Sequence, residues 1–338
     1  KKMKNYKILS FGLGIYLILL FASSVSAQGY NENEELVVVP PPMKFETASA
    51  HYAYLLERAG GGTQHTAATI PQWPGLWDTA GNTIGKTFLL DPEAILDVDD
   101  EQKGGRVRTG ILTPPYEQAF QERRQEMREA GQQKYDRLTH CESPGYPRFL
   151  LEPYTREFIN LPHQSWQLND LMNENRRIYI DQEHINVYGT HSWLGDSIGF
   201  WDGDRLITNT VDILPVDYFR GLPLTSNQFE SVEVWEMKIL GDGSQRLEVQ
   251  VTFYDENSLL EPINAVYAYK PAAVLMEIGA RIRQWECETS SNSYLTADGE
   301  TNFLLPGEPG YKDARGVTLF PHLPGQSRDP VYETGFEN

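Results

Sequence analysis

Polar and apolar residues alternate along much of the chain between Arg156 and Glu288, with the period of two that is typical of β-strands. The clearest case is Leu247 to Phe253, in which Leu, two Val and Phe share one face and polar residues share the other. Turn-forming residues separate further runs of this kind. We therefore expect strands at residues 156–161, 175–180, 196–201, 205–213, 231–239, 247–253, 263–270 and 281–288.

These short strands, with no helical pattern between them, predict a mainly β protein whose antiparallel sheet forms a barrel or a sandwich. One N-terminal amphipathic helix is expected before them, over residues 113–131, with Thr113 as its N-cap. Tyr116, Phe120 and Met127 fall near one face of this helix, and charged residues cover the rest. Its arginines alternate with glutamates, which indicates a solvated face rather than a nucleic-acid surface.

The two ends of the chain differ in composition from this central part. Residues 1–27 combine a lysine-rich start, an apolar run and small final residues, so we expect a secretory signal peptide that is cleaved after Ala27. A retained N-terminal anchor is the alternative, although the apolar run is short for a membrane span. Prolines and glycines predict an extended linker over 28–72 and a disordered or extended tail over 291–338. A single β-rich domain is thus expected over 73–290.

The chain is acidic, with 29 Lys and Arg against 47 Asp and Glu and a net charge of −18. The expected signal peptide carries four lysines and no acidic residue, so its removal changes the net charge to −22. Such a protein repels phosphate groups, which argues against nucleic acid and anionic membranes as partners. We expect a periplasmic or extracellular protein without an integral membrane span after signal cleavage.

The two cysteines of the chain, Cys141 and Cys287, form an even pair. In an exported protein such a pair most simply indicates a disulfide, and closing so long a loop stabilises a fold by about 4–5 kcal/mol on the chain-entropy model. A reactive thiol is the alternative, but neither cysteine lies in a C-x-x-C pair or another redox motif.

The segment Gly195–Gly199, which reads GDSIG, matches the G-x-S-x-G nucleophile elbow of serine hydrolases, with Ser197 in the place of the nucleophile. An elbow requires a helix directly after the serine. Here Asp202 and Gly203 follow between two β-prone runs, and this dipeptide is typical of a hairpin turn. His322 is the single histidine downstream of the serine, and it lies in the Pro/Gly-rich tail. We therefore interpret the segment as the first arm of a hairpin.

The densest mixture of polar and aromatic residues surrounds the same segment. Strand alternation places Asp196 on one face and Ser197 and Trp201 on the other, so the acid and the serine share a cavity only if a bulge intervenes. A Trp beside Gly199 fits either a flat ligand against the sheet or an ordinary core residue. The weak catalytic candidates are His191, Asp196 and Ser197, and the ligand-binding candidates are Arg176, Trp193 and Trp201.

We expect no cofactor and no metal site. The acidic segment Asp97–Glu101 lacks the glycine and the distal glutamate of an EF-hand loop, which indicates a solvated turn. His184, His191 and Asp196 could meet on one ion only if their loop folds back, and surface histidines are the simpler interpretation.

The segment RRIYID at 176–181, followed by GDSIGFWDGDRLI at 195–207, resembles a large group of exported bacterial proteins of unassigned function. The pattern of that group is R-R-I-Y-x-D and then G-H-S-I-G-x-W-E-G-D-x-L-V. CESPGYPR at 141–148 is similar to its C-x-P-P-G-x-P-R element, and WECET at 285–289 to its Y-x-C-E-E-N. Asp196 stands where the group usually has His. The resemblance supports the expected fold, export and disulfide, and it implies no particular reaction.

A second similarity concerns the start and the end of the expected sheet. Gly75-Leu76-Trp77 contains G-x-W, and Arg281 and Arg283 lie on the last expected strand. This is similar to lipocalin-type barrels, in which a Trp of the first strand packs under an Arg of the last. The similarity implies a closed barrel, with an open or doubled sheet as the alternative.

Three functions remain open at this point. The first is a binding module that takes an apolar or aromatic small molecule in a barrel mouth or on a sheet face. The second is a cofactor-free enzyme, such as a hydrolase, lyase or isomerase, in which His191 or Asp196 acts as acid or base. The third is a structural role at the cell surface through the Pro-rich tail.

Overall fold

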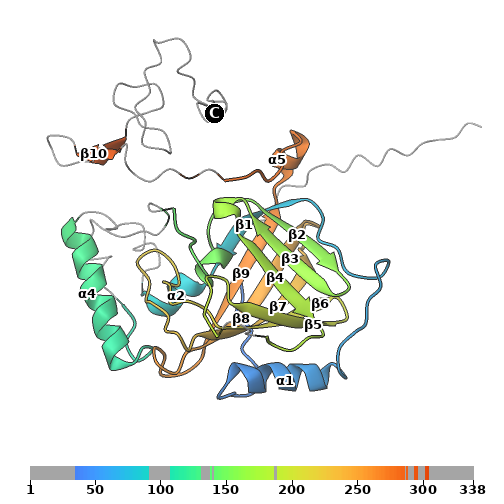
Figure 1. Cartoon of the computed structure of the whole chain (residues 1–338), viewed down its shortest axis with the longest axis horizontal. Helices are drawn as coiled ribbons and strands as arrows, with labels where there is room; N and C mark the ends of the chain where they lie inside the picture. The colour runs from blue at the N-terminus through green and yellow to red at the C-terminus, as the bar shows by residue number, and fades with distance from the viewer. Residues whose placement is uncertain are drawn as a thin grey trace, which may run out of the picture.

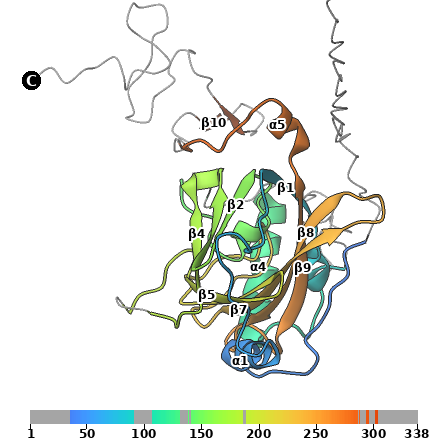
Figure 2. The same ribbon diagram turned by 90° about the vertical axis from the view of Figure 1, so that its right-hand side faces the viewer.

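Among the residues that the structure describes, nine strands close into a barrel in the computed structural model of the chain (Figures 1 and 2). The described residues are 35–90, 107–130, 138, 141–185, 189–285, 287, 293–295 and 301–303. The expected signal peptide, the acidic segment 97–101 and most of the expected tail lie outside them. The strands are β1 (Leu76–Asn82), β2 (Arg156–Leu161), β3 (Gln164–Asn169), β4 (Asn175–Ile180), β5 (Asp196–Asp202), β6 (Arg205–Val211), β7 (Glu230–Ile239), β8 (Gln245–Tyr254) and β9 (Ile263–Pro271).

The predicted mainly β fold is confirmed, and of the two expected arrangements, barrel and sandwich, the structure shows the barrel. The strands lie around the barrel in chain order, and β9 pairs with β1 to complete the ring. β8 contains the clearest alternating segment of the sequence, and its apolar residues Leu247, Val249, Val251 and Phe253 are all buried in the core. The period of two therefore reflects one face directed into the barrel and one directed away from it.

One pair of neighbouring strands departs from the expected antiparallel arrangement. β4 and β5 run parallel, with Ile178 opposite Ser197 and Ile180 opposite Gly199. The connection over residues 181–195 is much longer than a hairpin turn and returns the chain to the end of the barrel at which β4 began. The remaining neighbours are antiparallel, so the barrel is mixed.

The strand expected at residues 281–288 is wrong. The described residues of that range have no strand structure, because β9 already pairs with β1 and leaves no open edge. Arg281 and Arg283 consequently do not lie on the last strand, as the lipocalin similarity implied. Arg156 of β2 contacts the last strand, with its guanidinium carbon 4.9 Å from the centre of the Tyr269 ring.

Residues 28–72 do not form the expected extended linker throughout, because helix α1 lies within them. Thr47 caps this helix by accepting a hydrogen bond from the Ala50 N–H at 3.1 Å, and the helix packs outside the barrel against β6, β7 and β8 (Figure 1). The expected helix 113–131 is confirmed as α4. The helices are α1 (Ala48–Arg58), α2 (Ile84–Phe88), α4 (Pro114–Ala130) and α5 (Ala273–Glu277), with short 3-10 turns η3 (Arg148–Leu150) and η4 (Leu171–Asn173).

The expected tail after residue 290 also contains regular structure. β10 (Ser293–Leu295) and β11 (Thr301–Phe303) form a two-stranded antiparallel sheet. Before it, Cys287 forms the predicted disulfide with Cys141, with 5.6 Å between the two Cα atoms. No helix within the described ranges has both the length and the apolar character that a membrane crossing requires.

Candidate functional site

The GDSIG segment lies in a strand that leads into a hairpin, as predicted. β5 and β6 pair from Asp196 opposite Val211 to Asp202 opposite Arg205. Their two-residue turn begins at Gly203, whose φ of +60° lies in the left-handed region that glycine adopts without strain. No helix follows Ser197, so the arrangement required of a nucleophile elbow is not present at this position.

The alternation predicted along β5 separates Ser197 from Asp196. Ser197 and Trp201 are buried inside the barrel, each only 1% exposed. Phe200 faces outward, where its ring lies 5.2 Å from the ring of Tyr52 on α1. The carboxylate of Asp196 also faces outward and contacts the β4–β5 connection. The serine and the acid therefore do not share a cavity.

A polar network fills one part of the barrel interior, and Arg176 is its centre. Its guanidinium donates to Glu233 at 3.0 Å and to Thr210 at 2.7 Å. It also donates to Ser197 and to Gln167, both at 3.1 Å. Arg176, which the sequence indicated as a ligand-binding candidate, therefore forms its hydrogen bonds with side chains of the barrel, and it is only 1% exposed.

The segment before η3 closes this network by placing Tyr146 inside the barrel. The Tyr146 hydroxyl donates to the Glu233 carboxylate and contacts the Ser231 hydroxyl at 2.8 Å. Burial, together with the nearby Glu233 carboxylate, raises the pKa of Tyr146 well above its usual value, so the phenol keeps the proton that it donates. The Tyr146 side chain thus occupies space that an open barrel would offer to a ligand.

Aromatic side chains fill another part of the interior. Trp73 lies 5.8 Å from Trp201 and 6.2 Å from Trp235 between ring centres. Trp235 stacks on Tyr269 of β9 at 5.9 Å, and Phe158 contacts both of these rings at 5.8 Å. Trp201, the second inward-facing ligand candidate, is therefore a core residue in this structure.

The remaining candidates lie on the β4–β5 connection and next to it. Asp196 meets His184, not His191: its Oδ2 lies 2.9 Å from His184 Nδ1 and accepts from the Ile185 N–H at 3.1 Å. His184 Nε2 lies 2.9 Å from Asn209 Oδ1, whereas His191 Nε2 lies 3.0 Å from the Asn227 carbonyl oxygen. Within the part of the chain that the structure describes, no cluster of His, Cys, Asp and Glu could hold a metal ion.

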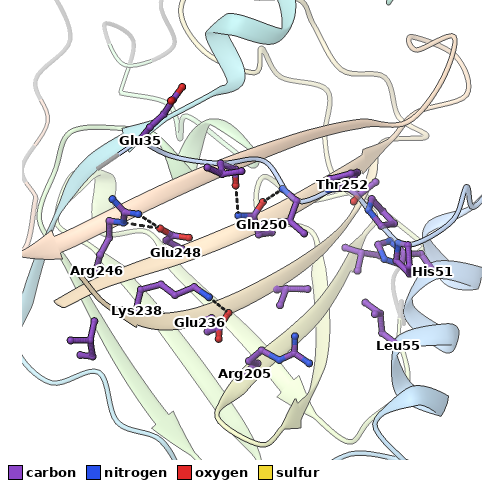
Figure 3. A pocket seen from close by; sticks show the side chains of 18 of the residues that line it. Glu35, His51, Leu55, Arg205, Glu236, Lys238, Arg246, Glu248, Gln250 and Thr252 are labelled. Atoms are coloured by element: carbon purple, nitrogen blue, oxygen red, sulfur yellow. Dashed lines mark hydrogen bonds and ion pairs between the residues drawn. The ribbon is translucent and has the colours of Figure 1, made fainter. Parts of the chain in front are cut away.

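An open site lies on the outside of the barrel, where the sequence had indicated no functional residue. It is a groove of about 570 Å³ between the outer faces of β7 and β8, helix α1 and an N-terminal strap of residues 35–42 (Figure 3). Gln250 of β8 holds the strap: its Oε1 accepts from the Val39 N–H at 3.0 Å, and its Nε2 donates to the Val37 carbonyl at 2.9 Å. The strap therefore forms one wall of the groove.

The lining of the groove changes character along its length. Near α1 it is apolar, with Leu55 of α1 and Val232 and Val234 of β7 facing the valines and prolines of the strap. Toward the other end of β7 and β8 it is charged, and Figure 3 shows two ion pairs there. The pairs are Lys238 with Glu236 at 2.5 Å and Arg246 with Glu248 at 2.7 Å.

One signal in the sequence could have indicated this groove. β7 reads ESVEVWEMKI, and its outward positions include Val232 and Val234, where an exposed strand face normally carries polar side chains. Apolar residues on the outward face of a strand indicate that another element covers that face, which here is the strap and α1.

No protein-family model matches the chain, and the search of curated proteins found no significant match. The functional interpretation therefore depends on the residues of the chain itself.

Proposed function

We propose that this protein is a binding module that takes an elongated, partly apolar small molecule in the groove between the strap, α1 and the β7–β8 face. One observation carries the proposal: side chains fill the barrel interior, whereas the groove on the outside of the barrel is open. A volume of about 570 Å³ falls within the range of roughly 300–1,000 Å³ that is typical of ligand sites. The apolar body of the ligand would lie against Val234 and Leu55.

A fluorescent apolar probe tests this proposal directly. N-phenyl-1-naphthylamine should bind the folded protein saturably, with an increase in its emission. Val234→Trp fills the apolar half of the groove, and we expect it to weaken binding at least tenfold. The matched control is Val274→Trp on α5, a position 71% exposed and outside the groove, which should leave binding unchanged.

Two results would contradict the proposal. The first is an absence of saturable binding by wild-type protein whose thermal unfolding remains cooperative. The second is equal affinity of Val234→Trp and wild type, since that places the probe elsewhere. Circular dichroism of each variant separates loss of the groove from loss of the fold.

The alternative of a cofactor-free enzyme receives less support from the same residues. Asp196 is engaged by His184 and by the Ile185 N–H, and His191 contacts a backbone carbonyl. Neither lines the groove. The charged groups of β7 and β8 that line it form ion pairs, and His51, which also lines it, lies 3.0 Å from the Tyr254 hydroxyl. This arrangement suits recognition of a ligand better than proton transfer.

We also propose that the protein acts outside the cytoplasm, as a member of the exported group that its motifs resemble. The Cys141–Cys287 disulfide supports this location, because such bonds persist mainly in oxidising compartments. The composition of residues 1–27 supports it independently. N-terminal sequencing of the protein recovered from its cells should begin at Gln28, whereas retention of the first 27 residues in a cytoplasmic fraction would refute the location.

A further inference from the structure

The register of β7 against β8 determines which charged side chains lie opposite each other at the charged end of the groove. Glu236 lies opposite Glu248, and Lys238 lies opposite Arg246. Residues two apart on a strand point to the same face and lie about 7 Å apart along it. The outer face therefore carries one cross-strand pair of carboxylates and, next to it, one cross-strand pair of cations.

Like charges directly opposite each other on a sheet repel, so this arrangement needs compensation. The compensation runs along each strand, where Lys238 pairs with Glu236 and Arg246 pairs with Glu248. The four side chains together are electrically neutral. A ligand with a single charge would gain energy at one of the two cross-strand pairs and lose it at the other, whereas a zwitterion can gain at both.

The apolar half of the groove lies on one side of these charges, so the charges follow it in a fixed order. Moving away from α1 along the outer face, Val232 opposite Thr252 comes first and Val234 opposite Gln250 second. The carboxylate pair follows, and the pair of cations comes last (Figure 3). A ligand whose tail lies against the valines thus meets negative charge before positive charge.

On the basis of the function proposed above, we propose that the groove selects a zwitterionic amphiphile of defined charge order. Its cationic group is adjacent to the apolar tail and contacts Glu236, and its anionic group is distal and contacts Lys238. Glu248 and Arg246 are only 10% and 4% exposed and contribute their charges to the same pattern without direct contact. The side chains of Glu236 and Lys238 are 39% and 41% exposed, so a bound head group can reach them. Arg205 and Glu35 also line the groove: Asp202 pairs with Arg205, and Glu35 belongs to the strap that forms one wall.

Two zwitterions with the same tail and opposite charge order test the proposal. In decyl sulfobetaine the ammonium adjoins the tail and the sulfonate is distal, whereas in decylphosphocholine the phosphate adjoins the tail and the ammonium is distal. Each is used below its critical micelle concentration to displace N-phenyl-1-naphthylamine from wild-type protein. We expect the sulfobetaine to bind at least tenfold more tightly than the phosphocholine, and more tightly than decyl sulfate or decyltrimethylammonium.

A charge exchange on β7 provides the matching variant. Glu236→Lys combined with Lys238→Glu keeps the net charge and the ion pair but inverts the order of charges on that strand. The preference for the sulfobetaine should then decrease at least fivefold. The control exchanges the exposed pair outside the groove, Lys44→Glu with Glu261→Lys, which should leave the preference unchanged.

The outcomes separate this inference from the proposed function. If the probe shows no saturable binding, the function itself fails. If the probe binds in the groove but the two zwitterions compete equally, or if the phosphocholine competes better, only the charge order is overturned. A preference that survives the β7 exchange would likewise overturn it, provided that thermal unfolding shows the variant to be folded.

Discussion

The guanidinium carbon of Arg176 lies 4.7 Å from the centre of the Tyr146 ring, inside the barrel. Glu233 connects the two side chains further, since it accepts a hydrogen bond from each of them. A cation over an aromatic face, with a shared carboxylate beside it, holds both groups in a fixed position. The segment that carries Tyr146 is thereby fastened to β4 and β7 and closes the interior.

Tyr146→Phe should destabilise the protein while it keeps the ring under Arg176. The change removes the hydroxyl that donates to Glu233 and contacts Ser231, at an expected cost of about 1–3 kcal/mol in the free energy of unfolding. Chemical denaturation measures this cost. Tyr154→Phe is the control, because Tyr154 is half-buried and contacts Trp285 through its ring. Equal stability of Tyr146→Phe and wild type would contradict the structural role of the hydroxyl.

The carboxyl group of Glu174 should make stability decrease as the pH rises. Burial raises its pKa from 4.5 to about 7, although hydrogen bonding from Ser143 and the charge of Arg156 oppose the shift. The folded state therefore favours the protonated acid, whose contribution is fully present below pH 4.5 and is lost as the pH rises through about 7. Its size is on the order of 2–4 kcal/mol.

Glu174→Gln tests this prediction, because glutamine stays neutral at every pH. The free energy of unfolding of the variant should change less between pH 5 and pH 8 than that of wild type. Glu261→Gln, at a side chain that is 72% exposed, is the matched control and should follow the wild-type profile. An identical pH profile for Glu174→Gln and wild type would refute the assignment.

His51 should have the opposite effect at acid pH. It is buried where α1 meets the barrel, stacks on Phe45 at 4.6 Å and lies 3.0 Å from the Tyr254 hydroxyl. Burial lowers its pKa from 6.5 to about 4. The stability that a neutral His51 contributes is present above pH 6.5 and is lost as the pH falls through about 4.

We therefore expect α1 to detach before the barrel unfolds as the pH is lowered toward 4. Hydrogen exchange over residues 45–58 should increase first, and probe binding in the groove should weaken with it, because His51 lines the groove. His51→Phe should remove most of this acid sensitivity, whereas His163→Phe in the exposed β2–β3 turn should not. Simultaneous exchange of α1 and the barrel would contradict the prediction.

Asp196→Ala should loosen the connection between β4 and β5. The aspartate is the acceptor for the Ile185 N–H and the partner of His184, so its loss removes two anchors at a cost of about 1–3 kcal/mol. Limited proteolysis should cleave the variant faster within residues 181–195. Asp204→Ala in the exposed β5–β6 turn is the control. Unchanged cleavage would show that other contacts hold the connection.

The sequence predicted strands most clearly where one face is apolar and the other polar. β8 has this pattern and was expected over nearly its full length, whereas β3 was missed. The reason lies in the barrel interior: Ser165, Gln167 and Asn169 of β3 point inward and are buried. The apolar residues Trp166 and Leu168 face outward, so β3 lacks the apolar inward face of β8. β3 contributes Gln167 to the network around Arg176, and these inward polar residues are the reason why the sequence did not predict the strand.

The candidate site could be predicted less well, because it combines segments that are distant along the chain. The strap bonds to Gln250 across more than 200 residues, and no local pattern reports such a contact. The proline-rich composition of the strap predicted only an extended conformation, and α1, which begins at Ala48, was not expected. Ser197 and Trp201 belong to the polar and aromatic cluster that the sequence indicated, and Arg176 was a separate ligand-binding candidate. The structure places all three inside the barrel.

The odd number of strands in the barrel explains why one contact between neighbouring strands is parallel. A ring of strands in which every neighbour reverses direction can close only when the number of strands is even. This ring has nine, so at least one contact must be parallel, and the chain places it at β4–β5. The connection over residues 181–195 therefore provides the parallel contact that closure of this ring needs. Replacing it with a tight turn would reverse every later strand and transfer the parallel contact to the β9–β1 junction.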